Sequence, residues 1–162
     1  MSLPIHHHNP RRPWAQQSLA GDLTLQRGRV HEFCGPSRLM LAARIMARCH
    51  GSVVWIRPGW ASERMNAAGL QPLADPSRLI LIQAPRDESL LWAAEEALRS
   101  GAVPLVIAEL LAPPALTPTR RLHLAAETGS EAALRDGTTP PLGLILLPGT
   151  GGAQGVESRW HL

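Results

Sequence analysis

The stretch of this sequence best placed to bind a phosphate group is Gly35-Pro36-Ser37-Arg38, which follows an apolar run. A phosphate-binding loop of the form G-x-x-x-x-G-K-[ST] uses glycine N–H groups, a lysine ammonium and a hydroxyl that holds Mg²⁺. Here the second glycine is missing, and all 16 basic side chains counted as Lys+Arg are arginines. The planar guanidinium of Arg38 does not reproduce the compact charge of an ammonium. We therefore expect a degenerate loop, no cofactor and no ATPase activity.

A carboxylate stands at the end of another apolar run, at Glu109. In an ATPase built on a parallel sheet, such a carboxylate would bind magnesium or activate water, because ligands bind beyond the carboxyl ends of the strands. Without a phosphate-binding loop it has no substrate to act on. We expect Glu109 to be a capping or partner-contact residue, with a vestigial acidic position as the alternative.

Two tryptophans and three arginines are candidates for contact with a partner protein or DNA: Arg57, Trp60, Trp92, Arg120 and Arg121. Both residue types are enriched at the energetic centres of interfaces, and arginine also contacts phosphates. A structural interpretation stays open for each. It is a solvated helix face for the arginine pair, core packing for Trp92, and a turn for the segment that holds Arg57 and Trp60.

Other catalytic patterns are not found in the sequence. His31, His50, His123 and His161 lack metal-ligand spacing, and no G-x-S-x-G nucleophile motif is present. Cys34 and Cys49 do not form a C-x-x-C pair, so we expect neither a disulfide framework nor a metal site. A reducing, cytoplasmic setting is the simplest interpretation, with Cys34 as a buried, inert thiol.

The apolar pattern predicts strands that alternate with helices. Strands are expected at residues 29–34, 52–57, 78–83, 103–108, 142–147 and 156–162, and helices at 38–49, 61–68, 87–100 and 117–127. Asp87 is expected to cap the third helix, and Gly51, Gly69, Gly101 and Gly129 to end the four helices. Continuous apolar strands separated by helices indicate a three-layer α/β domain with a mainly parallel sheet and helices on both faces. The short Gly-rich link over residues 148–155 predicts an antiparallel last strand.

The length of 162 residues suits one domain, and no apolar stretch approaches the ~20 residues that a membrane span requires. Positive charge is concentrated in the N-terminal part of the chain. Residues 1–48 hold seven arginines and two acidic residues, a net charge of +5, whereas the remainder carries −2. We expect a flexible basic arm over residues 1–20 and a core domain over residues 21–162. The arm either makes weak contact with DNA or is simply solvated.

Several segments resemble known families. Residues 28–36 resemble the strand and turn that open the RecA core. Four further stretches resemble ImuA, a family of RecA-like proteins from bacterial mutagenesis cassettes: residues 54–56, 91–101, 120–127 and 157–162. The resemblance covers roughly residues 28–162 and includes no catalytic signature.

The ImuA resemblance implies a non-catalytic adaptor of the DNA-damage (SOS) response. Such a protein would assist error-prone translesion synthesis through contacts with RecA and with a Y-family polymerase subunit of the ImuB type. Members of the family usually continue past the last strand, so we expect either a truncated C-terminus or a short variant. A more distant resemblance to SulA, a RecA-like family that blocks the division protein FtsZ, implies a cell-division inhibitor as the alternative.

Overall fold

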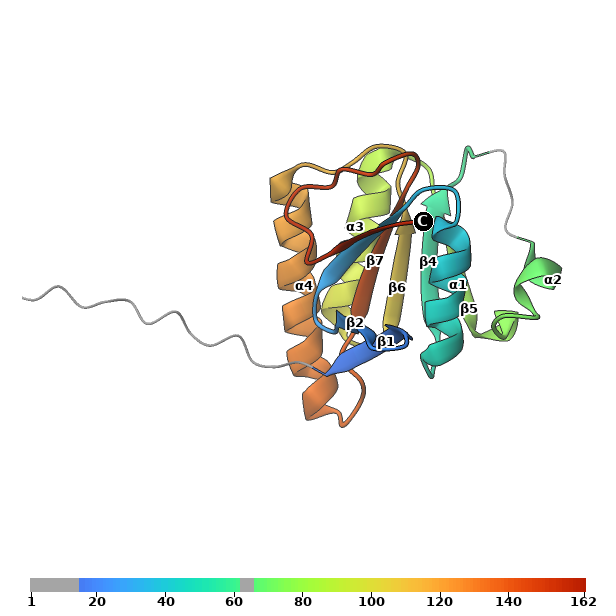
Figure 1. The fold of residues 1–162 in the computed structure, drawn as a ribbon. Coiled ribbons are helices and arrows are strands. Elements are labelled where there is room, and N and C mark those ends of the chain that lie inside the picture. The colour runs from blue at the N-terminus through green and yellow to red at the C-terminus, as the bar shows by residue number, and fades with distance from the viewer. Residues whose placement is uncertain (1–14, 62–65) are drawn as a thin grey trace, which may run out of the picture.

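The computed structural model describes residues 15–61 and 66–162, which form an α/β domain of three layers (Figure 1). Its central sheet has the strand order β5-β4-β6-β7-β3-β8, and every neighbouring pair in it is parallel. A small antiparallel sheet pairs β1 with β2. The strands are β1 (Gln16–Ala20), β2 (Leu23–Gln26), β3 (Val30–Cys34), β4 (Val53–Pro58), β5 (Leu79–Ala84), β6 (Leu105–Glu109), β7 (Leu142–Leu147) and β8 (Arg159–His161). The helices are α1 (Arg38–Arg48), α2 (Ala67–Leu70), α3 (Asp87–Ser100) and α4 (Leu116–Arg135), with a short 3₁₀ turn η1 (Pro76–Arg78).

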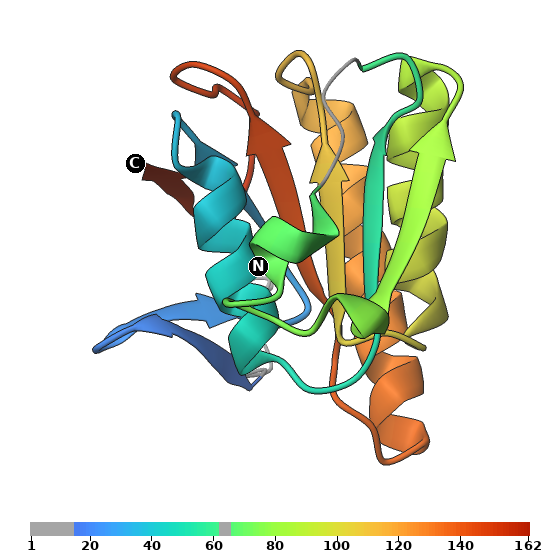
Figure 2. The ribbon, with the colours of Figure 1, turned by 90° about the vertical axis from the view of Figure 1, so that its right-hand side faces the viewer.

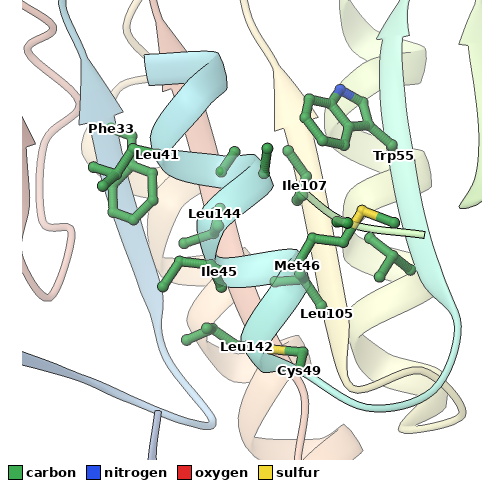
Figure 3. Close-up of a cluster of buried hydrophobic side chains, with 14 of the residues drawn as sticks. Phe33, Leu41, Ile45, Met46, Cys49, Trp55, Leu105, Ile107, Leu142 and Leu144 are labelled. Carbon is green, nitrogen blue, oxygen red and sulfur yellow. The ribbon is translucent and has the colours of Figure 1, made fainter. Parts of the chain in front are cut away.

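The core lies on both faces of the central sheet. Alternate strand residues such as Phe33, Trp55 and Leu144 pack against α1, as Figure 3 shows. The residues between them, such as Val54 and Ile145, pack against α3 and α4 on the opposite face. Because successive strand side chains point to opposite faces, an apolar residue at every position is what a sheet covered on both sides requires. The three-layer α/β prediction is confirmed.

The predicted antiparallel last strand is wrong. β8 runs parallel to β3, with Arg159 opposite Glu32 and His161 opposite Cys34. The prediction assumed that the Gly-rich link was a tight hairpin. The link in fact spans the whole interval between Leu147 and Arg159, which is long enough to cross over β3 and return along its far side. β8 therefore sits beyond β3, not beside β7, and is shorter than expected.

The predicted end of the fourth helix at Gly129 is also wrong, because α4 continues to Arg135. Gly129 lies inside the helix, where α3 passes so closely that a Cβ atom would fall 1.9 Å from the carbonyl oxygen of Leu98. Glycine is needed here for close packing between two helices. Glycine is common both at helix ends and at close contacts between helices. The sequence alone therefore does not distinguish the two roles at this position.

The N-terminal part of the described chain also differs from the structure predicted for it. β1 and β2 form a hairpin that the sequence analysis missed, so the predicted arm over residues 1–20 overlaps a strand that begins at Gln16. Residues 1–14, which hold the rest of that arm, lie outside the described residues. The predicted helix over residues 61–68 is replaced by α2, which includes the expected terminator Gly69. The part of it at residues 62–65 is likewise not described.

Smaller differences concern helix ends. The residue that caps α3 is Arg86, and Asp87 is its first helical residue. α1 ends with a cap at Cys49, two residues before the expected Gly51. Gly101 does end α3, in the left-handed conformation that favours glycine.

Replacing Gly129 with alanine tests the close contact between α3 and α4. The Gly129→Ala variant should be destabilised by about 2–4 kcal/mol, because the new Cβ must push the two helices apart. Gly69→Ala is the matched control. It adds a methyl group to an exposed helix with only ordinary contacts, and should be neutral or stabilising by up to about 1 kcal/mol. Urea unfolding of both variants measures the difference, and equal midpoints would contradict the packing argument.

Candidate functional site

The turn between β3 and α1 is the place where a phosphate-binding loop would lie. Gly35 has a φ of +87°, and α1 begins at Arg38 as predicted. The N–H of Ser37 donates to the carbonyl oxygen of Leu162 over 3.1 Å, and the N–H of Leu162 donates to the carbonyl of Cys34 over 3.2 Å. A Cβ atom on Gly35 would lie 2.2 Å from that same Leu162 oxygen. Main chain from the C-terminal strand therefore lies directly against the turn.

The remaining side chains of the turn do not face outward as anion ligands. The Arg38 guanidinium folds back and donates to the carbonyl of Gly35 over 3.1 Å. Pro36 has no N–H to donate. Ser37 precedes the helix, but its hydroxyl makes no capping hydrogen bond. The turn is thus a compact corner in which one N–H that could hold an anion is already donated to a carbonyl.

The C-terminal segment is held against β3 by a buried carboxylate that the sequence analysis did not single out. Glu32 is fully buried. Its Oε1 accepts from the N–H of Gly152 (3.0 Å) and from Nε of Arg159 (2.7 Å), while Oε2 accepts from the N–H of Ala153 (2.7 Å). The Arg159 guanidinium also donates to the carbonyl of Ala153. A charged residue in the middle of an apolar strand was the available signal.

Two histidines also form hydrogen bonds to the C-terminal segment. His31 donates from Nε2 to the carbonyl of Gln26, and its Nδ1 is hydrogen-bonded to the Ser158 hydroxyl over 2.7 Å. His123 accepts at Nδ1 from the N–H of Val30 and donates from Nε2 to the carbonyl of Gly155. Burial lowers the pKa of His31 and of His123 below the ordinary histidine value. Neither histidine belongs to a metal cluster within the described part of the chain.

Cys34 behaves as the sequence analysis expected of a buried, inert thiol. It is buried beside Glu32, and burial raises the pKa of its thiol, with the neighbouring carboxylate raising it further. The thiol is therefore protonated and a weak nucleophile near neutral pH. Cys49 is also buried, and both cysteines are free thiols.

Glu109 lies at the C-terminal end of β6, as predicted, and its role is defined by a tryptophan. The indole N–H of Trp55 donates to Oε1 of Glu109 over 2.7 Å. Together with Arg57 from the end of β4, these residues line the floor of a hollow of about 260 Å³ between α1 and α2. Its walls are apolar, formed by Leu39, Met40, Ala43, Leu70 and Leu73. We call this the α1–α2 hollow.

The α1–α2 hollow brings together two of the predicted site residues, Arg57 and Glu109. Arg57 is buried and engaged in interactions of its own. At the rim, Leu39, Met40 and Leu73 are exposed, Met40 at 50%. A concave apolar surface with a few polar groups at its base is the usual form of a site that receives an apolar ligand or side chain. No sequence signal pointed to this hollow, because a helix was predicted over residues 61–68 and not at α2.

The other predicted contact residues lie elsewhere. Trp60 follows β4 and is 47% exposed. Trp92 on α3 is 63% exposed, so the core-packing interpretation of this residue is wrong. Arg121 on α4 pairs with Glu95 of α3 over 2.8 Å, next to Trp92, while Arg120 is exposed. Trp92 and Arg121 line a separate hollow between α3 and α4 that does not include Arg57 or Glu109.

Part of the positive charge at the front of the chain is used inside the fold. Arg27 is buried and donates to the carbonyls of Pro104 (2.9 Å) and Pro140 (2.8 Å). Arg29 is also buried and pairs with Glu127. These two arginines cannot contact DNA, so the basic surface is smaller than the net charge of residues 1–48 suggested. Arg11 and Arg12 of the predicted basic arm lie outside the described residues.

Over the described ranges 15–61 and 66–162, no helix is long and apolar enough to cross a membrane. No protein-family model matches this sequence, and no curated protein sequence matches it. Among solved structures, the fold is similar to that in the crystal structure of SulA from Pseudomonas aeruginosa, with a TM-score of 0.54 and 20% sequence identity. The match covers 74% of this chain and 98% of that chain. It supports the α/β fold, while the ImuA resemblance stays a prediction.

Replacing Glu32 with glutamine tests the attachment of the C-terminal segment. Glu32→Gln should lower the free energy of unfolding by about 2–3 kcal/mol, because an amide cannot accept all three hydrogen bonds and leaves a donor unpaired. Amide exchange at Gly152 and Ala153 should accelerate. Glu96→Gln, which removes an exposed pair with Arg99, should change stability by less than about 0.5 kcal/mol. Unchanged exchange in Glu32→Gln would contradict the assigned role.

The two histidines predict a loss of stability in mild acid. Their folded-state pKa values are lowered, so the unfolded chain binds protons first as the pH falls below about 6.5. Stability is therefore full above that pH and falls as the pH decreases toward the folded-state values. Urea midpoints at about pH 7.5 and about pH 5.5 measure the loss, and His31→Gln should reduce it. A midpoint that rises on acidification would show that the histidines are charged in the fold.

Proposed function

We propose that this chain is a non-enzymatic accessory protein of the bacterial DNA-damage response that acts in the cytoplasm by binding other proteins. The observation that carries the proposal is the β3–α1 turn. It has no second glycine and no lysine, and one of its N–H groups is donated to Leu162. Triphosphate binding needs a row of free N–H groups and a compact cation at this position. We therefore expect no ATP hydrolysis.

The α1–α2 hollow supports protein binding at the carboxyl ends of the strands, where the β3–α1 turn also lies. Its apolar rim at Leu39, Met40 and Leu73 is exposed, whereas its floor holds Trp55, already hydrogen-bonded to Glu109. An apolar side chain from a partner would bury this rim while the indole N–H of Trp55 keeps its hydrogen bond to Glu109. Interfaces derive most of their affinity from a few such anchors in well-packed pockets.

The class of partner comes from the resemblance between residues 91–101 and 120–127 and the ImuA family. It implies RecA and a Y-family polymerase subunit of the ImuB type as partners in translesion synthesis. The first of these segments lies on α3 and carries the exposed Trp92, and the second lies on α4 and carries Arg120 and Arg121. Both helices cover one face of the sheet, so they offer a second surface for the same complex.

A second candidate function is inhibition of cell division through FtsZ. The observation that favours it is the similarity of the fold to the SulA crystal structure, which this chain matches over nearly the whole of that protein. Both candidates are non-enzymatic and depend on protein contacts. They differ in the partner, which makes them separable by one set of binding measurements.

Binding of the purified full chain to RecA, to an ImuB-type polymerase subunit and to FtsZ separates the candidates. The proposal predicts capture of RecA or the polymerase subunit, and Met40→Glu should weaken it by about tenfold or more, because a charge then faces the apolar rim. Leu23→Glu is the control, since Leu23 is exposed on β2, outside the α1–α2 hollow and outside α3 and α4. Capture of FtsZ alone would select the second candidate.

Two further outcomes would count against the proposal. Binding to none of the three proteins would remove the adaptor and the inhibitor together. Saturable binding of ATP with Mg²⁺, abolished by Glu109→Gln, would mean that the turn holds nucleotide despite its contacts with Leu162, and would restore an enzymatic function.

A further inference from the structure

The central sheet, whose β5 edge can be seen in Figure 2, has two edges that are protected very differently. β8 at one edge is a three-residue strand with two exposed polar side chains, Arg159 and His161. β5 at the other edge is twice as long, and its sequence, LILIQA, contains no charged residue. Short strands and charged side chains are the usual means by which proteins keep a sheet edge from pairing. Only the β8 edge uses them.

The β5 edge presents both the backbone groups and the apolar surface that a further strand would need. Within the described residues, β5 pairs with β4 alone, so half of its backbone N–H and C=O groups face away from the sheet. Ile80 is 49% exposed and Leu81 is 46% exposed. Since neighbouring residues point to opposite faces, apolar surface is present on both sides of the strand. Such an edge is unusual for a strand that remains unpaired.

We propose that β5 is a homodimer interface in which β5 of a second copy adds in antiparallel orientation, extending one continuous sheet through both molecules. A twofold axis perpendicular to the sheet keeps each residue on the same face in both copies. Residues that lie opposite one another must then be both odd-numbered or both even-numbered. Either Leu81 or Ile80 therefore faces its own copy at the centre of the pairing. In either register, the apolar residues of one copy meet those of the other on both faces.

Charge at the two ends of the strand fits this arrangement. Asp75 precedes β5, Arg86 follows it, and both are exposed. Antiparallel pairing places Asp75 of each copy beside Arg86 of the other, which gives two opposite-charge contacts related by the twofold axis. Arg78 does not compete for Asp75 of the other copy, because its guanidinium donates to the carbonyls of Met46 and Gly51 within its own chain. A parallel addition would instead place like charges together.

Sedimentation velocity over a range of concentrations tests the interface. The wild-type chain should form a dimer, and Ile80→Lys and Leu81→Lys should each raise its dissociation constant by about 100-fold, because a charge would be buried in the pairing. Both side chains are half-exposed in the monomer, so the lysine variants should keep the wild-type thermal midpoint when both are measured well below the dissociation constant of the wild-type dimer. Leu124→Lys, at a site 62% exposed on α4, is the matched control and should dimerise normally.

A charge exchange tests the orientation and stays informative if a lysine variant unfolds. Arg86→Asp should weaken the dimer by about tenfold, because it places two acidic side chains together at each end. Adding Asp75→Arg to the same chain should restore the wild-type constant. A wild-type chain that is monomeric at about 100 μM, a dimer that neither lysine variant weakens, or a charge exchange without recovery would each overturn the proposal.

Discussion

The buried carboxylate of Glu32 is the interaction on which the segment after β7 depends. A fully buried charge is unfavourable unless hydrogen bonds replace its hydration, and Glu32 has such bonds from Gly152, Ala153 and Arg159. All three partners belong to the segment after β7. Satisfying one charge therefore fixes where that segment runs, and places β8 along β3. The main chain then reaches the β3–α1 turn at Leu162.

This constraint explains why the fold was predictable in part. The five long strands of the central sheet are specified by their own apolar residues, which local pattern detects, and their positions agree with the sequence to within two residues. The direction of β8 depends on a contact between Glu32 and residues more than 100 positions away. The continuation of α4 through Gly129 depends in the same way on the backbone of α3. No local pattern contains either contact.

The features of the candidate site likewise fall into those set by local sequence and those set by contacts between distant residues. Its chemistry was predictable, because the missing lysine and glycine and the carboxylate at Glu109 are properties of residue type and position. Its shape was not, because the α1–α2 hollow needs Trp55 and Met40 from separate elements, closed by a helix that was expected elsewhere. Trp92 shows the limit of a residue-type argument. Tryptophan is most often buried in part, yet this one is largely exposed, beside an ion pair that joins two helices.

The position of the C-terminal strand also decides what kind of recognition remains open to this fold. At the β3 side of the sheet, backbone donors are used internally, by Leu162 at the turn and by β8 along the edge. By contrast, β5 at the opposite edge of the sheet and the rim of the α1–α2 hollow expose aliphatic side chains. A nucleotide is bound through backbone donors and cations, whereas a protein is bound through apolar anchors and strand edges. The surface that this fold leaves accessible is of the second kind, which supports the proposal that the protein acts through protein contacts.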